Sequence, residues 1–310
     1  MSRRLIVLLV VLVVGAVAAP AGAITDGQLD GDTHPQVGQL LFFDPTVPSS
    51  RYPDDGAWYN CSGTLLSATI VLTAGHCTFG VGDGGGDMWV SFLPTSDYSM
   101  LLGSGTFLTN AARYAQWSEA LDASTTWYEG TAYPHPQYDD NLFFLFDAGI
   151  VVLSEPVPES VVPASAYGQL PEEGYLDDFI GNKKAGSRFT PVGYGMEDTQ
   201  PWWTDMGGDT RMNASVMLIN TRGVFGIDAL ARKLGIPNPS VVFSNNNGAA
   251  HQGGTCFGDS GGPVFDGASN LVVAVTSFGM NGNCGGTGGA YRIDQTDDLE
   301  FIDSYLYPTP

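Results

Sequence analysis

The hexapeptide Gly258-Asp259-Ser260-Gly261-Gly262-Pro263, here called the serine motif, surrounds one serine with three glycines. A nucleophilic serine needs its hydroxyl exposed on a tight turn, with backbone amides close enough to bind the developing oxyanion. Glycines permit such a turn because they adopt backbone conformations that other residues avoid. A Gly-x-Ser-x-Gly pattern alone is weak evidence, since a single serine more often has a structural role. The prediction of a nucleophile therefore depends on partners elsewhere in the chain.

Two further segments supply those partners. The segment 72–77, Leu-Thr-Ala-Gly-His-Cys, places His76 directly after a β-type run. The segment 146–153, Phe-Asp-Ala-Gly-Ile-Val-Val-Leu, places the lone carboxylate of Asp147 at the start of an apolar run. A carboxylate there is expected to be buried, where it can fix the tautomer of a histidine and stabilise the imidazolium. His76, Asp147 and Ser260 are therefore the predicted catalytic triad.

These segments resemble the motifs of the trypsin/chymotrypsin family of serine proteases over roughly residues 24 to 307. The family's Gly-Asp-Ser-Gly-Gly-Pro is matched without change, and its Thr-Ala-Ala-His-Cys is matched except for Gly75. The order His, Asp, Ser is also the family's order, unlike that of subtilisins or α/β-hydrolases. Shorter matches are Cys61-Ser62-Gly63-Thr64-Leu65 for Cys-Gly-Gly-Ser-Leu, His135-Pro136-Gln137-Tyr138 for His-Pro-x-Tyr, Gly193-Tyr194-Gly195 for Gly-Trp-Gly, and Ser277-Phe278-Gly279 for Ser-Trp-Gly.

The resemblance implies an all-β fold of two six-stranded antiparallel β-barrels of the chymotrypsin type, followed by a C-terminal helix. The composition agrees, because 41 glycines and 19 prolines divide the 310 residues into short segments, and long helices are not evident. The predicted parts are a signal peptide at 1–23, a first barrel at 24–153 carrying His76 and Asp147, a linker at 154–174, and a second barrel at 175–310 carrying Ser260 and the C-terminal helix.

The clearest β-type runs are rich in Val, Ile, Phe and Tyr and end at turn-forming residues. They are 37–43, 69–73, 88–93, 150–153, 189–194, 214–219, 271–277 and 290–293. The segments Asp44–Tyr59 and Met196–Ala250 are irregular in composition and are interpreted as inserted loops, the second with a short helix at 225–234.

The best helix candidate is Thr296–Tyr307. Leu299, Ile302 and Leu306 fall on one face of it. Asp297 and its neighbour lie in the first turn, where the helix dipole favours anions.

Residues 1–23 have the pattern of a secretory signal peptide. Arg3 and Arg4 precede an apolar run at 5–14, and Ala21-Gly22-Ala23 has the small residues of a cleavage site. The alternative is a membrane anchor, which the shortness of the run disfavours. The predicted product is secreted, either outside the cell or into the periplasm of a Gram-negative cell, with no membrane attachment after cleavage.

The chain is strongly acidic, with 33 Asp and Glu against 12 Lys and Arg and a formal net charge of −21. Such a field repels nucleic acids and anionic membranes, so neither is a predicted partner. No Cys/His cluster has the spacing of a zinc site, so neither a metal nor a cofactor is predicted. His34, His135 and His251 have no predicted role, and the acidic segment 82–87 is interpreted as a solvated turn. We predict a monomer that acts on protein or peptide substrates.

Export implies an oxidising compartment, so the four cysteines are expected to form two disulfides. Four cysteines allow three pairings. The resemblance selects Cys61–Cys77 and Cys256–Cys284. The first would brace the loop that holds His76, and the second would tie the segment before Ser260 to the specificity pocket.

The resemblance also implies the mechanism. His76 would take the proton of Ser260 as the hydroxyl attacks a peptide carbonyl, and Asp147 would orient His76. The backbone amides of Gly258 and Ser260 would form the oxyanion hole, and Ser277 would support Asp147.

The primary specificity pocket of the family has its base six residues before the nucleophile, which here is Gly254. No carboxylate occupies the base or the walls, so an Arg or Lys side chain would find no buried partner. Thr276 stands where glutamate-specific relatives carry a histidine. An open pocket of this kind favours Phe, Tyr or Leu before the cleaved bond. The other predicted substrate-binding residues are Ser277, Phe278, Gly279 and Gly289.

The sequence after the predicted cleavage site, Ile24-Thr25-Asp26-Gly27, stands where the family has Ile-Val-Gly-Gly. In the family this new N-terminus folds inward, and its ammonium pairs with the aspartate before the nucleophile, here Asp259. We therefore predict that signal peptidase itself creates the active N-terminus. The alternative is that Ile24 begins a loose leader that is cleaved further on.

Two other functions remain open at this point. The first is a catalytically silent relative that binds a partner, although such proteins usually lose a triad residue and this chain keeps all three. The second is a secreted esterase on the same fold, which would cleave ester but not peptide substrates.

Overall fold

A computed structural model of the chain describes residues 24–81, 87–179, 187–198, 206–221, 227–236, 238–245, 253–280 and 282–308. The predicted signal peptide, His251 and all of the predicted acidic turn except Asp87 lie outside these residues. No helix within the described ranges is long and apolar enough to cross a membrane.

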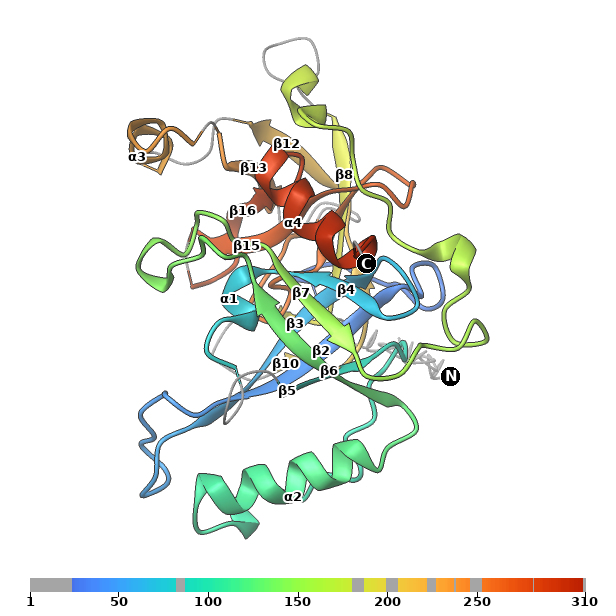
Figure 1. Ribbon diagram of the computed structural model, residues 1–310, viewed down its shortest axis with the longest axis vertical. Coiled ribbons are helices and arrows are strands. Elements are labelled where there is room, and N and C mark those ends of the chain that lie inside the picture. Colours follow the sequence, from blue (N-terminus) through green and yellow to red (C-terminus); the bar gives the residue numbers. More distant parts are fainter. Residues whose placement is uncertain are drawn as a thin grey trace, which may run out of the picture.

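The first six-stranded barrel is antiparallel and closed in the order β2-β3-β4-β7-β6-β5 (Figure 1). Its interior is filled by aliphatic side chains such as Leu40, Met88 and Val151, all fully buried. The strands are β2 (Val37–Asp44), β3 (Ala57–Leu65), β4 (Ile70–Thr73), β5 (Asp87–Ser91), β6 (Trp127–Pro134) and β7 (Gly149–Leu153).

The second barrel has the same order relative to the chain, β8-β12-β13-β16-β15-β14, and the pairing of β14 with β8 closes it. Two such barrels confirm the predicted fold class. The strands are β8 (Arg188–Gly193), β12 (Val216–Asn220), β13 (Ser240–Asn245), β14 (Pro263–Asp266), β15 (Val272–Gly279) and β16 (Gly286–Arg292). Short outer strands are β1 (Gln28–Leu29), β9 (Met196–Asp198), β10 (Met206–Gly207) and β11 (Met212–Asn213).

The strands that lie between the barrels have continuous apolar runs rather than alternating apolar and polar residues. In β15, Val273 points into the second barrel, whereas Val272 and Val275 join a cluster shared by both barrels. Both faces of such a strand are buried, which explains why the run contains no charged residue.

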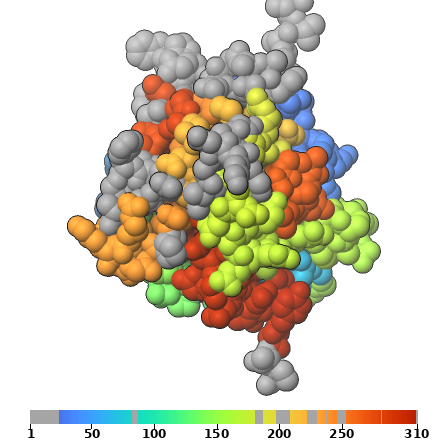
Figure 2. All heavy atoms as spheres, turned by 90° about the horizontal axis from the view of Figure 1, so that it is seen from above, coloured from blue at the N-terminus to red at the C-terminus, as the bar shows by residue number. Residues whose placement is uncertain are grey.

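The helix α4 (Thr296–Leu306) closes the chain against that shared cluster. Its buried apolar residues are Phe301 and Ile302, and the partly buried Leu306 packs against the same cluster. Of the predicted stripe, only Leu299 is not among the residues of that cluster. Asp298 is buried and accepts hydrogen bonds from the Tyr291 hydroxyl at 2.9 and 3.1 Å. Figure 2 shows α4 (red) beside the segment that follows β7 (yellow-green), and Thr296 Oγ1 donates to Glu173 there at 2.7 Å.

The remaining helices include one that the sequence reading missed. The 13-residue helix α2 (Asn110–Asp122) contradicts the expectation that long helices are absent before the C-terminus. It lies on the outside of the first barrel, beneath β5 and β6 in Figure 1, and only Asn110 and Leu121 are fully buried. A helix with so little apolar surface has no stripe for the sequence to reveal. The others are α1 (Gly75–Thr78), α3 (Ile227–Lys233) and 3₁₀ turns at Ser104–Thr106, Asp140–Leu142, Ala164–Ala166 and Tyr175–Phe179.

The two predicted insertions are also wrong in part. Strands β12 and β13 of the second barrel lie within Met196–Ala250, and the ends of Asp44–Tyr59 belong to β2 and β3. Strand β13 escaped notice because Ser240, Ser244 and Asn245 interrupt its apolar run, yet all six of its residues are buried.

A buried arginine connects the N-terminal segment to both barrels. Arg211 is 1% exposed, and its guanidinium donates to Asp30 Oδ2 at 3.0 Å. It also donates to the carbonyl oxygens of Val37 at 2.9 Å and Phe92 at 3.1 Å, and to the Tyr194 hydroxyl at 3.1 Å. Arg211 therefore connects segments that are far apart in the sequence through its hydrogen bonds.

Candidate active site

The candidate triad is assembled from three strand ends. His76 lies in α1 directly after β4, Asp147 precedes β7, and Ser260 precedes β14. His76 Nδ1 is 3.1 Å from each carboxylate oxygen of Asp147, and the His76 amide donates to Asp147 Oδ1 at 2.9 Å. Ser277 Oγ donates to Asp147 Oδ2 at 2.5 Å. Asp147 is fully buried, so these contacts fix its orientation.

His76 and Ser260 line the same cleft, which has a volume of about 1250 Å³. Within the described part of the chain, the Ser260 hydroxyl makes no hydrogen bond to His76. Catalytic hydrogen bonds are often long before substrate binds. Burial alone would lower the pKa of His76. The charge of Asp147 and its hydrogen bond to His76 outweigh the effect of burial, with a smaller contribution from the charge of Asp140, so the pKa of His76 is raised. This environment stabilises the imidazolium that forms when His76 accepts a proton.

The backbone before Ser260 forms the turn at which the oxyanion hole is predicted. The amides of Gly258 and Ser260 donate to no described residue, so both are available to a ligand. Gly258 has φ +98°, and a Cβ there would lie 2.9 Å from Asn60 Nδ2 and from Gly195 Cα. Both facts require glycine at this position.

Asp259 is fully buried below this turn. Its carboxylate accepts the amides of Gly195 and Cys256, both at 2.8 Å. Burial raises the pKa of Asp259 to about 7, although these hydrogen bonds act in the opposite direction. A carboxylate in this position would gain from a cationic partner.

Ser62 is a site residue that the sequence reading missed. Its hydroxyl donates to the Gly258 carbonyl and accepts from the Tyr194 amide, both at 2.9 Å, and its own amide donates to the Ser260 carbonyl at 2.8 Å. The only signal in the sequence was that Ser62 replaces a glycine of the family motif. Ser62 therefore connects β3 of the first barrel to the turn that carries the oxyanion-hole amides.

The N-terminal segment lies against the same region. Ile24 is fully buried and packs on Met212 and Ala214. Thr25 pairs with Gly254 through two backbone hydrogen bonds of 3.0 Å, and its hydroxyl donates to the Gly254 carbonyl at 3.1 Å. The Ile24 nitrogen is part of a peptide bond in the 310-residue chain. Its pairing with Asp259 remains a prediction.

The predicted specificity pocket opens beside Ser260, between residues 254–258 and Ser277-Phe278-Gly279. Successive residues of β16 point in opposite directions. A Cβ on Gly288 would lie 2.8 Å from Thr255 Oγ1, whereas a Cβ on Gly289 would meet the Phe278 ring at 2.2 Å. Gly288 therefore faces Thr255 and Gly289 faces Phe278, and both glycines line the cavity described next.

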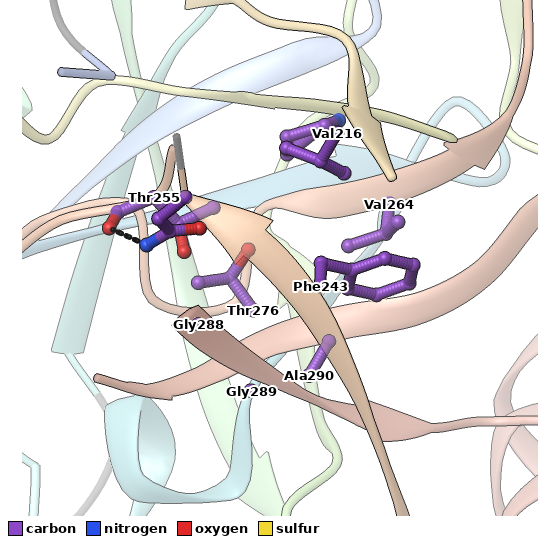
Figure 3. A pocket seen from close by; sticks show the side chains of 10 residues that line it. Val216, Phe243, Thr255, Val264, Thr276, Gly288, Gly289 and Ala290 are labelled. Atoms are coloured by element: carbon purple, nitrogen blue, oxygen red, sulfur yellow. Dashed lines mark hydrogen bonds between the residues drawn. The ribbon is translucent and has the colours of Figure 1, made fainter. Parts of the chain in front are cut away.

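A small cavity continues from this pocket into the second barrel (Figure 3). Thr255 and Thr276 line one side, and Phe243 and Val264 line the other. Thr276 Oγ1 is buried and has no hydrogen-bond partner among the described residues. Asn245, which the sequence reading missed, lies against the predicted base Gly254 and donates to the Thr255 carbonyl at 3.0 Å.

Two disulfides flank the site. Cys61–Cys77 joins β3 to α1, and Cys256–Cys284 joins the segment before Ser260 to the loop before β16. They are the pairs that the resemblance implied. Each ties a segment of the candidate site to another part of the barrel that carries it.

Comparison with known proteins supports the resemblance found in the sequence motifs. No family model matches the chain. Brachyurin from Leptuca pugilator is 26% identical over 230 residues, which cover 73% of this chain and 78% of that protein. A solved structure titled HL collagenase matches the fold with a TM-score of 0.61 at 17% identity, covering 93% of this chain and all of the other. The motif order, the two-barrel fold and the likeness to brachyurin together support a serine protease similar to those of the trypsin/chymotrypsin family.

Proposed function

We propose that this protein is a secreted serine endopeptidase that hydrolyses peptide bonds through an acyl-enzyme. The observation that carries the proposal is the buried Asp147, held by Ser277 and by two hydrogen-bond donors of His76. His76 in turn lines the same cleft as Ser260. Buried carboxylate, histidine and serine in this arrangement are the components of acyl transfer.

The chemistry follows from the positions of these groups. The Ser260 oxygen attacks the peptide carbonyl carbon as its proton moves to His76, and the amides of Gly258 and Ser260 bind the resulting oxyanion. The proton then passes from His76 to the leaving amine, and the peptide C–N bond breaks. Water, deprotonated by His76, hydrolyses the ester and regenerates Ser260.

A fluorophosphonate probe and a matched ester and amide substrate test the proposal. Covalent labelling of Ser260 with hydrolysis of both substrates is the expected result. Absence of labelling would favour the catalytically silent binding protein, and hydrolysis of the ester alone would favour the esterase. Secretion is tested by the location of the mature chain.

The residue before the cleaved bond is expected to be large and apolar. Gly254, Gly279 and Gly289, which are predicted to form the pocket, carry no side chain. The side chain nearest to Gly254 is that of Asn245, so the described residues at this place offer no carboxylate to pair with a cation. Profiling with a peptide library should show Phe, Tyr or Leu preferred over Arg by about 100-fold or more, because an unpaired buried cation is strongly disfavoured. A strong preference for Arg or Lys would contradict this pocket assignment.

Ser62→Ala is expected to lower kcat about tenfold with little change in KM. The substitution removes the hydrogen bond donated to the Gly258 carbonyl and the one accepted from the Tyr194 amide. Each contributes about 1 kcal/mol, and a loss of about 1.4 kcal/mol in the transition state gives the tenfold effect. The orientation of the adjacent amide matters most when the oxyanion forms, so the loss should appear in kcat. Steady-state kinetics on a peptide amide and the thermal midpoint of unfolding are measured together. A lower midpoint with unchanged kcat would show that Ser62 has only a structural role.

A further inference from the structure

The active-site cleft extends well beyond the triad, along the outside of the first barrel. One arm leads from Ser260 to the specificity pocket. The other follows β3, where Asn60 is adjacent to the oxyanion turn and Trp58 lies two residues further on. Residues two apart in a strand share a face and are about 7 Å apart. The far part of this arm, here called the aromatic arm, is lined by Trp58, Tyr98, Leu101, Leu102, Arg113 and Trp117.

The aromatic arm is built by β3, α2 and the segment between β5 and α2. The Trp58 and Trp117 rings are 5.1 Å apart between centroids, and Trp117 Nε1 donates to the Leu102 carbonyl at 2.9 Å. Asp54, which lies between β2 and β3, accepts the amides of the first two residues of α2, at 2.8 and 2.7 Å. These bonds hold α2 against the loop between β2 and β3, so the arm is preformed.

Two polar atoms in this arm lack partners. Trp58 Nε1 and Arg113 Nε are both buried and make no hydrogen bond within the described part of the chain. An unsatisfied buried donor is unfavourable unless a ligand supplies an acceptor. Both atoms are donors, so the ligand group that matches them is a hydrogen-bond acceptor.

The charge of the arm is unusual for this protein. Arg51 and Arg113 are the only lysine or arginine residues between positions 24 and 182, in a chain of net charge −21. Arg113 is stacked over the Trp117 ring at 4.4 Å and forms no ion pair with any acid that the structure describes. Asp44 also lines the cleft, but its carboxylate accepts from the amide and hydroxyl of Thr46.

We propose that the aromatic arm binds the substrate chain on the C-terminal side of the cleaved bond and selects a segment with a carboxylate beside a large apolar side chain. The apolar side chain packs on the Trp58 and Trp117 rings, and the carboxylate accepts from Arg113. The direction follows from the pocket, because a peptide with one side chain in the pocket and its carbonyl at Gly258 continues toward β3. This assignment rests on the proposed peptidase function.

Two pairs of measurements test the proposal. Quenched peptides with the same residues before the cut carry either Glu-Phe or Gln-Phe two to four residues after it, and a short p-nitroanilide lacks that part entirely. The native enzyme is expected to cleave the Glu peptide with a kcat/KM about tenfold above that of the Gln peptide. Arg113→Gln should remove that difference and leave p-nitroanilide hydrolysis unchanged. The matched control Arg188→Gln changes an exposed arginine of β8 that lies away from the cleft.

The second measurement is independent of catalysis. Binding of the fluorescently labelled Glu and Gln peptides to the Ser260→Ala protein is followed by anisotropy, and the Glu peptide should bind about tenfold more tightly. Trp58→Phe, which removes the indole N–H but keeps an aromatic ring, should weaken binding of both peptides. Equal binding of the two peptides would overturn the proposal. Selective binding without hydrolysis of any substrate by the native enzyme would instead overturn the peptidase function while supporting the arm.

Discussion

Ser260→Ala is expected to lower kcat for peptide hydrolysis by about six orders of magnitude while the protein remains folded. The hydroxyl is the proposed nucleophile, and without it no acyl-enzyme can form. What remains is binding and oxyanion stabilisation, which accelerate the direct attack of water only modestly. The measurement compares kcat of the purified native and variant proteins on one peptide substrate, with circular dichroism to verify the fold.

A serine outside the site provides the control for this experiment. Ser304→Ala, on the exposed side of α4, should retain full activity. Ser260→Ala should also lose labelling by a fluorophosphonate. Hydrolysis by folded Ser260→Ala protein within tenfold of the native rate would refute the assignment of the nucleophile.

The second large effect concerns the residue in front of Ile24. A protein that begins at Ile24 presents an ammonium that can pair with the buried Asp259, whereas one extra residue replaces the ammonium with an amide. An unpaired buried charge costs about 3–5 kcal/mol. The buried Ile24 also has φ +64°, an unfavourable conformation for a β-branched residue within a chain. We expect the Ile24 form to be fully active and the extended form to lose most of its activity.

The pH dependence of stability gives a separate measure of the same pairing. In the extended form the folded pKa of Asp259 is raised to about 7, above its unfolded value near 3.8. The protonated carboxyl is then the favoured folded form, so the free energy of unfolding should decrease as pH rises from about 4 to about 7. The Ile24 form should lack this decrease. N-terminal sequencing of the active secreted enzyme that finds another start, or full activity of the extended form, would contradict the prediction.

The sequence predicted the barrels well and the surface helix poorly, for a physical reason. Most barrel strands bury long runs of Val, Ile and Phe, and such runs are visible without knowledge of the fold. Strand β13 is buried just as deeply, but Ser240, Ser244 and Asn245 interrupt its apolar run. The Asn245 amide finds its acceptors, the carbonyls of Thr255 and Cys284, outside the strand. Helix α2 depends on Asp54 and on aromatic contacts with the barrel, and those contacts exist only after folding.

The residues of the candidate site also differ in how well the sequence predicted them. His76, Asp147 and Ser260 lie in motifs with local signals, so their roles could be proposed from the sequence. The function of Ser62 depends on Gly258, which is 196 residues away in the chain. The faces of β16 on which Gly288 and Gly289 lie depend on the register of that strand, and one residue of register reverses the direction of every side chain.

The pair formed by Asp30 and Arg211 has a consequence for the proposed secreted protease, because each molecule would be exposed to proteolysis by its other copies. Chain ends are common targets of proteolysis. Removal of the first seven residues after Ala23 would take Asp30 away and leave the Arg211 guanidinium buried without its counter-charge, at a cost of about 3–5 kcal/mol. That cost is a large fraction of the stability of a typical domain. A molecule trimmed at this end is therefore expected to be less stable than the intact protein and to be digested more readily by its neighbours.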